Sequence, residues 1–462
     1  MRWSVLKIKS ISFLFNKESD KSLYHQLYDC IVQQVFDGYM KVGDQLPSIR
    51  SLANQLKLSK TTIENTYEML LAEGYIISYP KVGYFIDVTI ENGFSSNQVT
   101  EKAIKKETSK TYKFDFSSKS VDETIFNISI WKKYLKNVLE MKSEIGSYGN
   151  PQGELFLREE LTSYSYRVRG VHATSDRMII GAGIQPLLSI CLGLFLDRKI
   201  TIAIEEEGFI QAKRVFLDSR CELIEIKKDS EGINIQDLKS HKFDILYLNT
   251  TSSGKNKKRI SAKLRFEILK LATKQNFYIL EDDHNGELFY TSRLIPAMQG
   301  FDQDDKVIYI GSFSKLLLPS IRLAYMVLPT YLMEIYNTKK DSYNQTSSKI
   351  EQLTLAFYIQ QGVMERYLKK LRKLYLEKSQ LVIKYIEECF PNRCYVFQEN
   401  TLQIQLFGPF EKSTEEIMAD ANQASINLPI YHNKDLMLSF SGIKKENIKE
   451  ACILLSEICS RN

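Results

Sequence analysis

The sequence lacks the cysteine spacing and the long apolar runs that mark several classes of protein. Its seven cysteines are scattered and form no CxxC pair, which argues against a disulfide framework and against a zinc site. No apolar run reaches the roughly 18 residues that a membrane helix needs. The opening Met1–Asn16 contains Lys7 and Lys9 and no small-residue cleavage site, so it makes a poor signal peptide. We therefore expect a cytoplasmic protein with reduced thiols and no metal site.

A strong charge of one sign is also missing. The 462 residues carry a net charge of +6, so any contact with nucleic acid must come from a local patch. A hydrophobic content of 44% and a charged content of 26% are ordinary for a globular protein. At roughly 150 residues per domain, the length predicts about three compact units.

The N-terminal part has the pattern of three helices and a hairpin. Apolar spacing predicts helices from Leu23 to Phe36, from the N-cap Ser48 onward, and from the turn at Ser59 to Gly74. Two β-rich runs follow, at 75–78 and 84–88, joined around a Pro-Lys-Val-Gly turn. This order is typical of a winged helix-turn-helix.

The third of these helices carries side chains suited to reading DNA. The second helix of a helix-turn-helix enters the major groove with its first turn toward the bases, so this turn needs short donors and a cation. The sequence supplies Ser59, Lys60, Thr61, Thr62 and Asn65 there. Candidates for flanking contacts, including contacts to phosphates, are Ser48, Arg50, Lys81 and Gly83. Taken singly, each residue is better explained as a helix start or a solvated charge; the ordered set predicts DNA binding.

The same segment resembles a known family. The run LPSIRSLANQLKLSKTTI, from Leu46 to Ile63, resembles the DNA-binding domain of the GntR regulators, and YEMLLAEGY, from Tyr67 to Tyr75, matches the family's next block. The resemblance covers 23–88 and implies a regulator that binds a double-stranded DNA operator. The hairpin turn keeps one glycine, Gly83, where the family often shows two.

Composition divides the chain into a head, a linker and a body. An arm of residues 1–20 precedes the winged helix-turn-helix of 21–90, and residues 91–112 are polar and aperiodic, which predicts a linker. Beyond it, β-rich runs alternate with helical ones, so we expect an α/β sheet covered by helices on both faces. We divide this body into a large domain of 113–364 and a small C-terminal domain of 365–462.

Three residue types in the body suit pyridoxal chemistry, which needs a lysine for the aldehyde, a carboxylate for the pyridine nitrogen and donors for the phosphate. Lys315 follows the β-rich run at 307–310, at the end of a strand where α/β sites gather. Asp282 ends another β-rich run, and Arg322, with Ser312 and Ser314, offers phosphate donors. Taken alone, Lys315 is better explained as a surface lysine after a strand, and Asp282 as a helix or turn cap.

The surrounding blocks resemble the effector domain of the MocR subgroup of GntR regulators, which is similar to fold type I aminotransferases. They are ILEDDHNGEL from Ile279, IPAMQG from Ile295, IYIGSFSKLLLPSIRLAY from Ile308, YGNPQG from Tyr148 and YLKKLRKLY from Tyr367. The resemblance implies that Lys315 holds pyridoxal 5'-phosphate (PLP) as an aldimine and that Asp282 pairs with the pyridine nitrogen. It implies phosphate contacts from Arg322 and Ser312, stacking by Phe209, and phosphate-binding amides at Gly183, Ile184 and Gln185.

Some positions depart from the pattern of aminotransferases. His284 stands where a tyrosine usually bonds the phenolic oxygen of the cofactor, and Glu207 replaces a proline. The loop LNTTSSG, from Leu248, lacks the usual proline and histidine. Met437 lies roughly where aminotransferases carry an arginine for the substrate carboxylate, which argues against the usual binding of an amino acid.

These observations leave three hypotheses. The favoured one is a homodimeric regulator, without turnover, whose DNA binding responds to PLP or to an amine effector that reacts with it. In the second, the aminotransferase-like body has lost PLP and serves dimerisation or binds another ligand. In the third, the protein is an active PLP-dependent aminotransferase with an accessory DNA-binding domain.

Overall fold

The computed structural model describes residues 21–88, 112–117, 120–195, 199–206, 208, 210–230, 232–253, 259–290, 295–399, 401–429 and 435–460. The chain forms two compact units, Met1–Lys110 and Thr111–Asn462. The N-terminal arm, most of the linker, Glu207 and Phe209 lie outside the described residues. Within the described part, no helix combines the length and the apolar character needed to cross a membrane.

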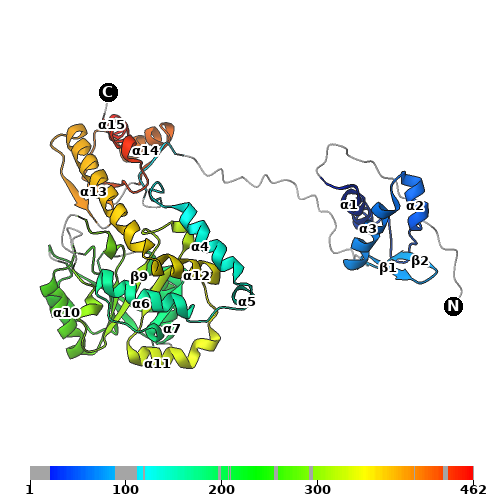
Figure 1. Ribbon diagram of the computed structural model, residues 1–462. Coiled ribbons are helices and arrows are strands. Elements are labelled where there is room, and N and C mark those ends of the chain that lie inside the picture. The colour runs from blue at the N-terminus through cyan, green and yellow to red at the C-terminus, as the bar shows by residue number, and fades with distance from the viewer. Residues whose placement is uncertain are drawn as a thin grey trace. The chain divides into compact units, whose positions relative to one another are not determined.

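The N-terminal unit is the expected winged helix-turn-helix (Figure 1). Its elements are α1 (Leu23–Phe36), α2 (Ile49–Leu56), α3 (Lys60–Ala72), β1 (Ile76–Tyr79) and β2 (Gly83–Ile86). Ser48 and Ser59 begin α2 and α3, because their hydroxyls accept hydrogen bonds from the amides of Ser51 and Thr62. The hairpin strands differ by one or two residues from the predicted runs, since antiparallel pairing of Tyr79 with Gly83 sets the turn.

The second unit contains a large sheet with the strand order β4-β10-β9-β8-β7-β5-β6. Strands β5 to β9 pair in parallel, and β10 is antiparallel to both β4 and β9. The strands are β4 (Met178–Gly181), β5 (Thr201–Glu205), β6 (Glu222–Ile226), β7 (Ile245–Asn249), β8 (Tyr278–Asp282), β9 (Val307–Ser312) and β10 (Ala324–Val327).

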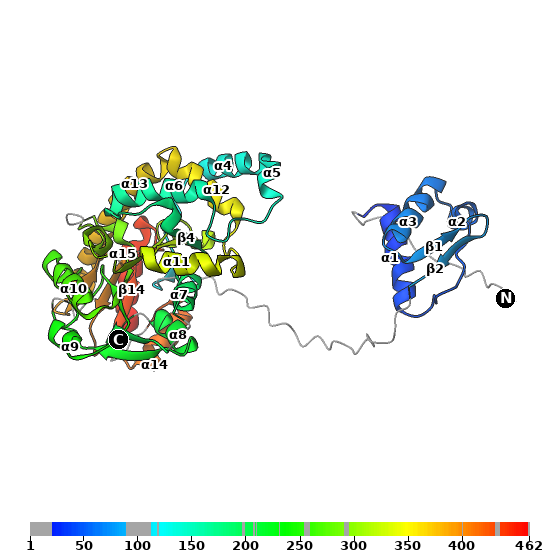
Figure 2. The same ribbon diagram turned by 90° about the horizontal axis from the view of Figure 1, so that it is seen from below.

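Helices cover both faces of this sheet, as the alternating pattern predicted (Figures 1 and 2). One face packs on α6, α10 and α12, and the other on α7, α8 and α11. The helices of this region are α4 (Ile128–Glu140), α5 (Lys142–Ile145), α6 (Leu155–Arg169), α7 (Ile184–Gly193), α8 (Ile210–Asp218), α9 (Ile235–Ser240), α10 (Ala262–Gln275), α11 (Thr330–Lys339) and α12 (Lys349–Gln360).

The C-terminal part forms a smaller α+β layer. It comprises α13 (Val363–Cys389), β11 (Tyr395–Gln398), β12 (Gln403–Leu406), α14 (Thr414–Gln423), β13 (Ile426–Asn427), β14 (Leu436–Ser439) and α15 (Ile448–Cys459). Strands β11, β12 and β14 form an antiparallel sheet. The two-residue strand β3 (Phe114–Asp115), which follows the linker in the chain, pairs in parallel with β13 of this C-terminal layer. The first strand of the second unit is therefore hydrogen-bonded to a strand of its C-terminal layer.

Candidate functional site

Three consecutive carboxylates, Glu281, Asp282 and Asp283, are buried at the carboxyl end of β8. Side chains along a strand alternate between the two faces, so the outer two point to one face and the middle one to the other. Glu281 lies 3.8 Å from Arg265, and Asp283 forms a two-bond ion pair with Arg169, at 2.6 and 2.9 Å. Of the three carboxylates, Asp282 alone has no arginine partner among the described residues.

Asp282 receives one side-chain hydrogen bond, and one of its oxygens remains available. The hydroxyl of Tyr247, on the adjacent strand β7, donates to Oδ2 of Asp282 at 2.5 Å. The other oxygen, Oδ1, is buried and accepts no hydrogen bond from the described residues. Burial raises the pKa of Asp282 to about 6, and the bond from Tyr247 opposes this rise. An unpartnered buried acceptor of this kind suits a cationic N–H group on a ligand.

Lys315 follows β9, and His284 follows the adjacent strand β8, so the two side chains lie at neighbouring strand ends. Burial lowers the pKa of Lys315 to about 8, although the charge of Asp115 opposes this effect. Burial, and then the positive charge of Lys315, lower the pKa of His284 to about 4. At neutral pH, His284 is therefore a neutral imidazole, and about a tenth of Lys315 is a neutral amine able to attack a carbonyl carbon, far more than for an ordinary lysine.

Gly183 and Arg322 form a cradle at the N-terminus of α7. Gly183 has a φ of +93°, and a Cβ placed there would lie 2.8 Å from Nη2 of Arg322, so only glycine leaves room for this approach. Ile184 and Gln185 open α7, where backbone N–H groups have no acceptor within the helix. Arg322 also donates to the Ala182 carbonyl, at 3.5 Å. A guanidinium beside free helix amides favours an anion such as phosphate.

Ser312 and Ser314 lie between the cradle and Lys315. Ser312 ends β9 and pairs with Ala324 of β10, which in turn pairs with Gly181 just before the cradle. The Ser312 hydroxyl donates to the Ser314 hydroxyl at 3.3 Å and accepts the Ser314 amide at 3.3 Å. The sheet therefore gathers the predicted lysine, carboxylate, serines and arginine at one edge.

These residues fit PLP on three separate grounds. The orphaned oxygen of Asp282 suits the pyridine N–H, the amine of Lys315 suits the aldehyde, and the cradle at Gly183 suits the phosphate. Tyr247 was missed by sequence reasoning, because the register that brings it to Asp282 depends on strand pairing. Thr346 was missed too: its hydroxyl accepts a hydrogen bond from the Ala182 amide, at 3.0 Å.

Met437 lies on β14, opposite Gln405 of β12. The amide nitrogen of Gln405 donates to Asp435 at 2.9 Å, so its polar end is already engaged. At this position the strand presents a thioether and an amide, and neither carries the positive charge that a carboxylate prefers.

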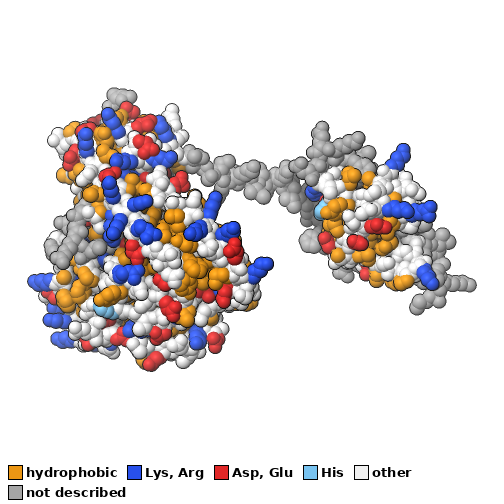
Figure 3. Space-filling model, viewed as in Figure 1, with side chains coloured by type: hydrophobic (Ala, Val, Ile, Leu, Met, Phe, Trp, Pro, Cys, Tyr) orange, Lys and Arg blue, Asp and Glu red, His pale blue; other side chains and the backbone are white. Residues whose placement is uncertain are grey.

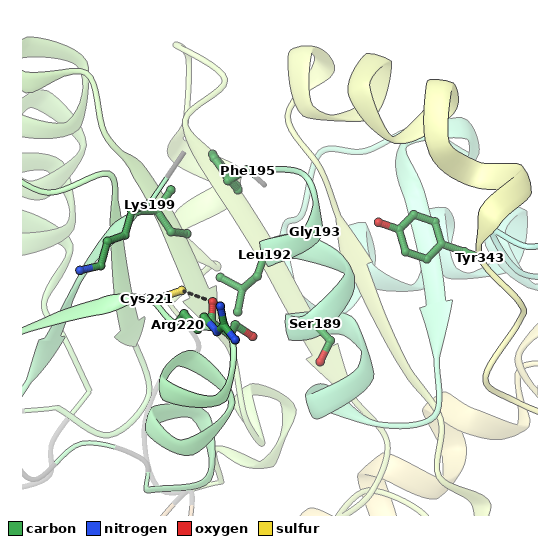
Figure 4. Close-up of a pocket in the computed structure, with 10 residues that line it drawn as sticks. Ser189, Leu192, Gly193, Phe195, Lys199, Arg220, Cys221 and Tyr343 are labelled. Atoms are coloured by element: carbon green, nitrogen blue, oxygen red, sulfur yellow. Dashed lines mark hydrogen bonds between the residues drawn. The ribbon is translucent and has the colours of Figure 1, made fainter. Parts of the chain in front are cut away.

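A cavity of 620 Å³ opens at the other end of α7 (Figure 4). It is lined by Leu192 and Gly193 of that helix, by Cys221, and by Tyr343 on its far side. The cradle lies at the N-terminus of α7 and this cavity at its C-terminus, so the cavity is not part of the candidate site.

On the N-terminal unit, α3 presents the predicted DNA-reading side chains. Lys60, Thr61 and Asn65 are exposed, as are Arg50 on α2 and Lys81 in the hairpin turn. The remaining predicted residues have structural contacts: Ser48 and Ser59 cap helices, the Thr62 hydroxyl bonds to that of Ser59, and Gly83 has a φ of +131°.

Comparison with known proteins agrees with this division. Residues 23–86 match the model of the bacterial regulatory proteins of the gntR family, and residues 118–453 match that of aminotransferase class I and II. The chain is 33% identical over 453 residues to the HTH-type transcriptional regulator YdeL of Bacillus subtilis, covering 95% of this chain and 97% of YdeL. It is 24% identical to the probable rhizopine catabolism regulatory protein MocR of Rhizobium meliloti, over 95% of this chain and 94% of MocR.

Solved structures agree on the fold of the body. The kynurenine aminotransferase of Pyrococcus horikoshii aligns with a TM-score of 0.66 at 22% identity, over 76% of this chain and 91% of that one. This likeness establishes the α/β fold of type I aminotransferases for the second unit.

Proposed function

Because the chain belongs to the MocR-type transcription regulators, which join a GntR-family DNA-binding domain to a class I and II aminotransferase domain, we propose that it controls operator binding through PLP held covalently on Lys315. The observation that carries this proposal is the pair of features at β8. Asp282 alone of three buried carboxylates lacks a cation, and its Oδ1 lacks any hydrogen bond from the described residues.

Each residue of the site has a role in holding the cofactor. Lys315, with its lowered pKa, supplies the neutral amine for the covalent bond. Asp282 holds the pyridine N–H, and Tyr247 orients its carboxylate. Bound PLP supplies an aldehyde carbon that exchanges between primary amines.

The anionic end of the cofactor lies in the cradle. Arg322, Ser312, Ser314 and the amides of Gly183, Ile184 and Gln185 hold the phosphate. His284, a neutral imidazole beside Lys315, hydrogen-bonds the phenolic oxygen.

DNA recognition uses the exposed side chains of the N-terminal unit. Lys60, Thr61 and Asn65 at the start of α3 reach base edges in the major groove, and Arg50 and Lys81 contact phosphates. Lys and Arg side chains project from this unit in the space-filling view (Figure 3). Two such units on a homodimer read two half-sites.

Exposed apolar side chains support the homodimer. Four residues of the α4 to α6 region, which each expose between 47% and 103% of their area, are Ile128, Leu139, Tyr148 and Leu155. Exposed apolar side chains of this size gain free energy when a partner surface covers them. Burial of this surface against a second copy removes it from water.

We assign sensing, without turnover, to the aminotransferase-like domain. Met437, opposite Gln405, gives a substrate carboxylate no cation on β14. A primary amine effector would be sensed by competing with Lys315 for the carbon that PLP supplies.

The test is visible absorbance of the purified protein with added PLP, compared with Lys315→Ala and checked by borohydride trapping. A band that the variant lacks supports the cofactor assignment. Absence of the band in the wild type favours a body that has lost PLP. Operator affinity is then measured on duplexes selected by the protein from a random pool. Equal affinity with and without PLP contradicts the regulatory role, and release of a keto acid from added amino acids supports an active aminotransferase.

A further inference from the structure

The first residues after the linker run along the small C-terminal layer and end at Lys315. We call the described residues Tyr112–Ser117 and Ser120–Asp122 the strap. The strap is fixed to the small layer by backbone bonds: β3 pairs with β13, and the Phe116 carbonyl accepts the Ser439 amide at 2.8 Å. Lys113 adds an ion pair with Glu450 of α15, at 2.7 Å.

The strap contacts the reactive amine directly. The Ser120 carbonyl accepts hydrogen bonds from Nζ of Lys315 at 3.5 Å and from the Ser441 hydroxyl at 2.7 Å. The negative charge of Asp115, also on the strap, acts on Lys315. Ser120 presses on Gly442, where an added Cβ would lie 2.0 Å from its hydroxyl oxygen. Ser120 is therefore held between Lys315 and the loop after β14.

A buried ion pair anchors the end of the strap. Nζ of Lys378, on α13, lies 3.0 Å from Asp122 and also donates to the Ser441 carbonyl at 3.0 Å. Both side chains of the pair are buried, with exposures of 0% and 2%. If either side chain moved away, the other would remain as an unpaired buried charge, which is strongly destabilising. The pair therefore holds this end of the strap in place. A continuous set of polar contacts thus runs from Lys378 through Ser441 and Ser120 to Lys315.

From this connection we infer that the strap carries the state of Lys315 to the linker, an inference that rests on the proposed function of Lys315. Without PLP, Nζ of Lys315 donates to the Ser120 carbonyl. A covalent bond to the aldehyde carbon of PLP would use both hydrogens of the neutral amine, which would leave with the aldehyde oxygen as water. The Ser120 carbonyl would then keep the Ser441 hydroxyl as a donor but lose the bond from Lys315, and the strap would loosen at that point.

An amine effector reverses the change. A primary amine that displaced Lys315 from the cofactor carbon would give its two protons to Nζ, and Lys315 would again donate to the Ser120 carbonyl. Lys378 and Asp122 act in this scheme as positioning residues, because they hold Ser120 against Lys315 without touching the cofactor.

The experiment measures amide hydrogen exchange of the strap in the full chain, with and without PLP. Exchange over 112–122 is expected to rise severalfold when PLP binds the wild type. In Ser441→Ala, which removes one bond to the Ser120 carbonyl, exchange without PLP is already raised and the response to PLP is reduced. Ser456→Ala is the matched control, because its hydroxyl bonds to the Ile453 carbonyl within α15 and to the Cys389 thiol on α13, neither of which belongs to the strap, and it should respond like the wild type.

A second variant tests the anchor. The double change Asp122→Leu with Lys378→Met removes the pair without leaving a buried charge. We expect it to bind PLP within about threefold of the wild type by absorbance, yet to lose the effect of PLP on DNA affinity. If PLP produces the absorbance band but leaves hydrogen exchange of the wild-type strap unchanged, the proposed role of the strap is wrong and the cofactor assignment stands. Absence of the band in the wild type overturns both.

Discussion

Replacing Tyr247 by Phe tests the electrostatics of the candidate site most directly. The hydroxyl of Tyr247 donates to Oδ2 of Asp282 at 2.5 Å, inside the sheet. Its removal takes from Oδ2 of Asp282 the only side-chain donor that the described residues give it, while Oδ1 already has no partner among them. A hydrogen bond to a charged acceptor contributes about 1.5–3 kcal/mol, so its loss should raise the pKa of the carboxyl by roughly one to two pH units.

The size of the effect on PLP binding depends on pH in a defined direction. Asp282 must be ionised to hold the pyridine N–H, and burial already raises its pKa to about 6. At pH 6 the variant therefore binds PLP about tenfold more weakly or worse than the wild type, whereas near pH 9 both carboxyls are ionised and the affinities converge. Other groups that titrate, such as Lys315 and the cofactor, cancel in the ratio of the two dissociation constants.

The assay is an absorbance titration with PLP between pH 6 and pH 9. Tyr336→Phe is the matched control, because its buried hydroxyl has no hydrogen-bond partner among the described residues, and its ratio to the wild type should stay near one throughout. A ratio for Tyr247→Phe that is near one at pH 6, or that does not change with pH, refutes the role given to Asp282.

Four further predictions follow from the same contacts. Because the pKa of Asp282 rises from 3.8 to about 6 on folding, its contribution to the stability of the apo-protein should fall by about 3 kcal/mol as pH rises through this interval, and the difference in unfolding free energy between the wild type and Asp282→Asn should change with pH by that amount. Gly183→Ala should raise the dissociation constant of PLP roughly tenfold, since its Cβ would meet Arg322 and its φ is +93°; a titration that matches the wild type contradicts the cradle. Asp283→Ala leaves a buried arginine unpaired and should lower the free energy of unfolding by about 3–5 kcal/mol in urea. Asn65→Ala should weaken binding to selected duplexes by about 1–3 kcal/mol without changing PLP absorbance, and unchanged DNA affinity would remove Asn65 from the interface.

Local sequence was sufficient for the head. Its helices begin at serines whose side chains cap the next turn, and its apolar spacing matches a core that includes Leu27, Ile31, Ile63 and Tyr67. These signals act within a few residues along the chain, so the pattern alone predicts the three helices and the hairpin. Local sequence also predicts the strand before Lys315. The family resemblance, and not local sequence, assigned Lys315 and Asp282 to the same cofactor.

Only tertiary structure decided which groups surround these residues. Tyr247 reaches Asp282 across 35 residues, Arg169 reaches Asp283 across 114, and Lys315 reaches the Ser120 carbonyl across 195. A period of two shows that Glu281 and Asp283 share a face, but not which arginines lie above it. Those neighbours follow from the strand order and register of the sheet and from the return of β3 to the small layer, which depend on packing of the whole unit.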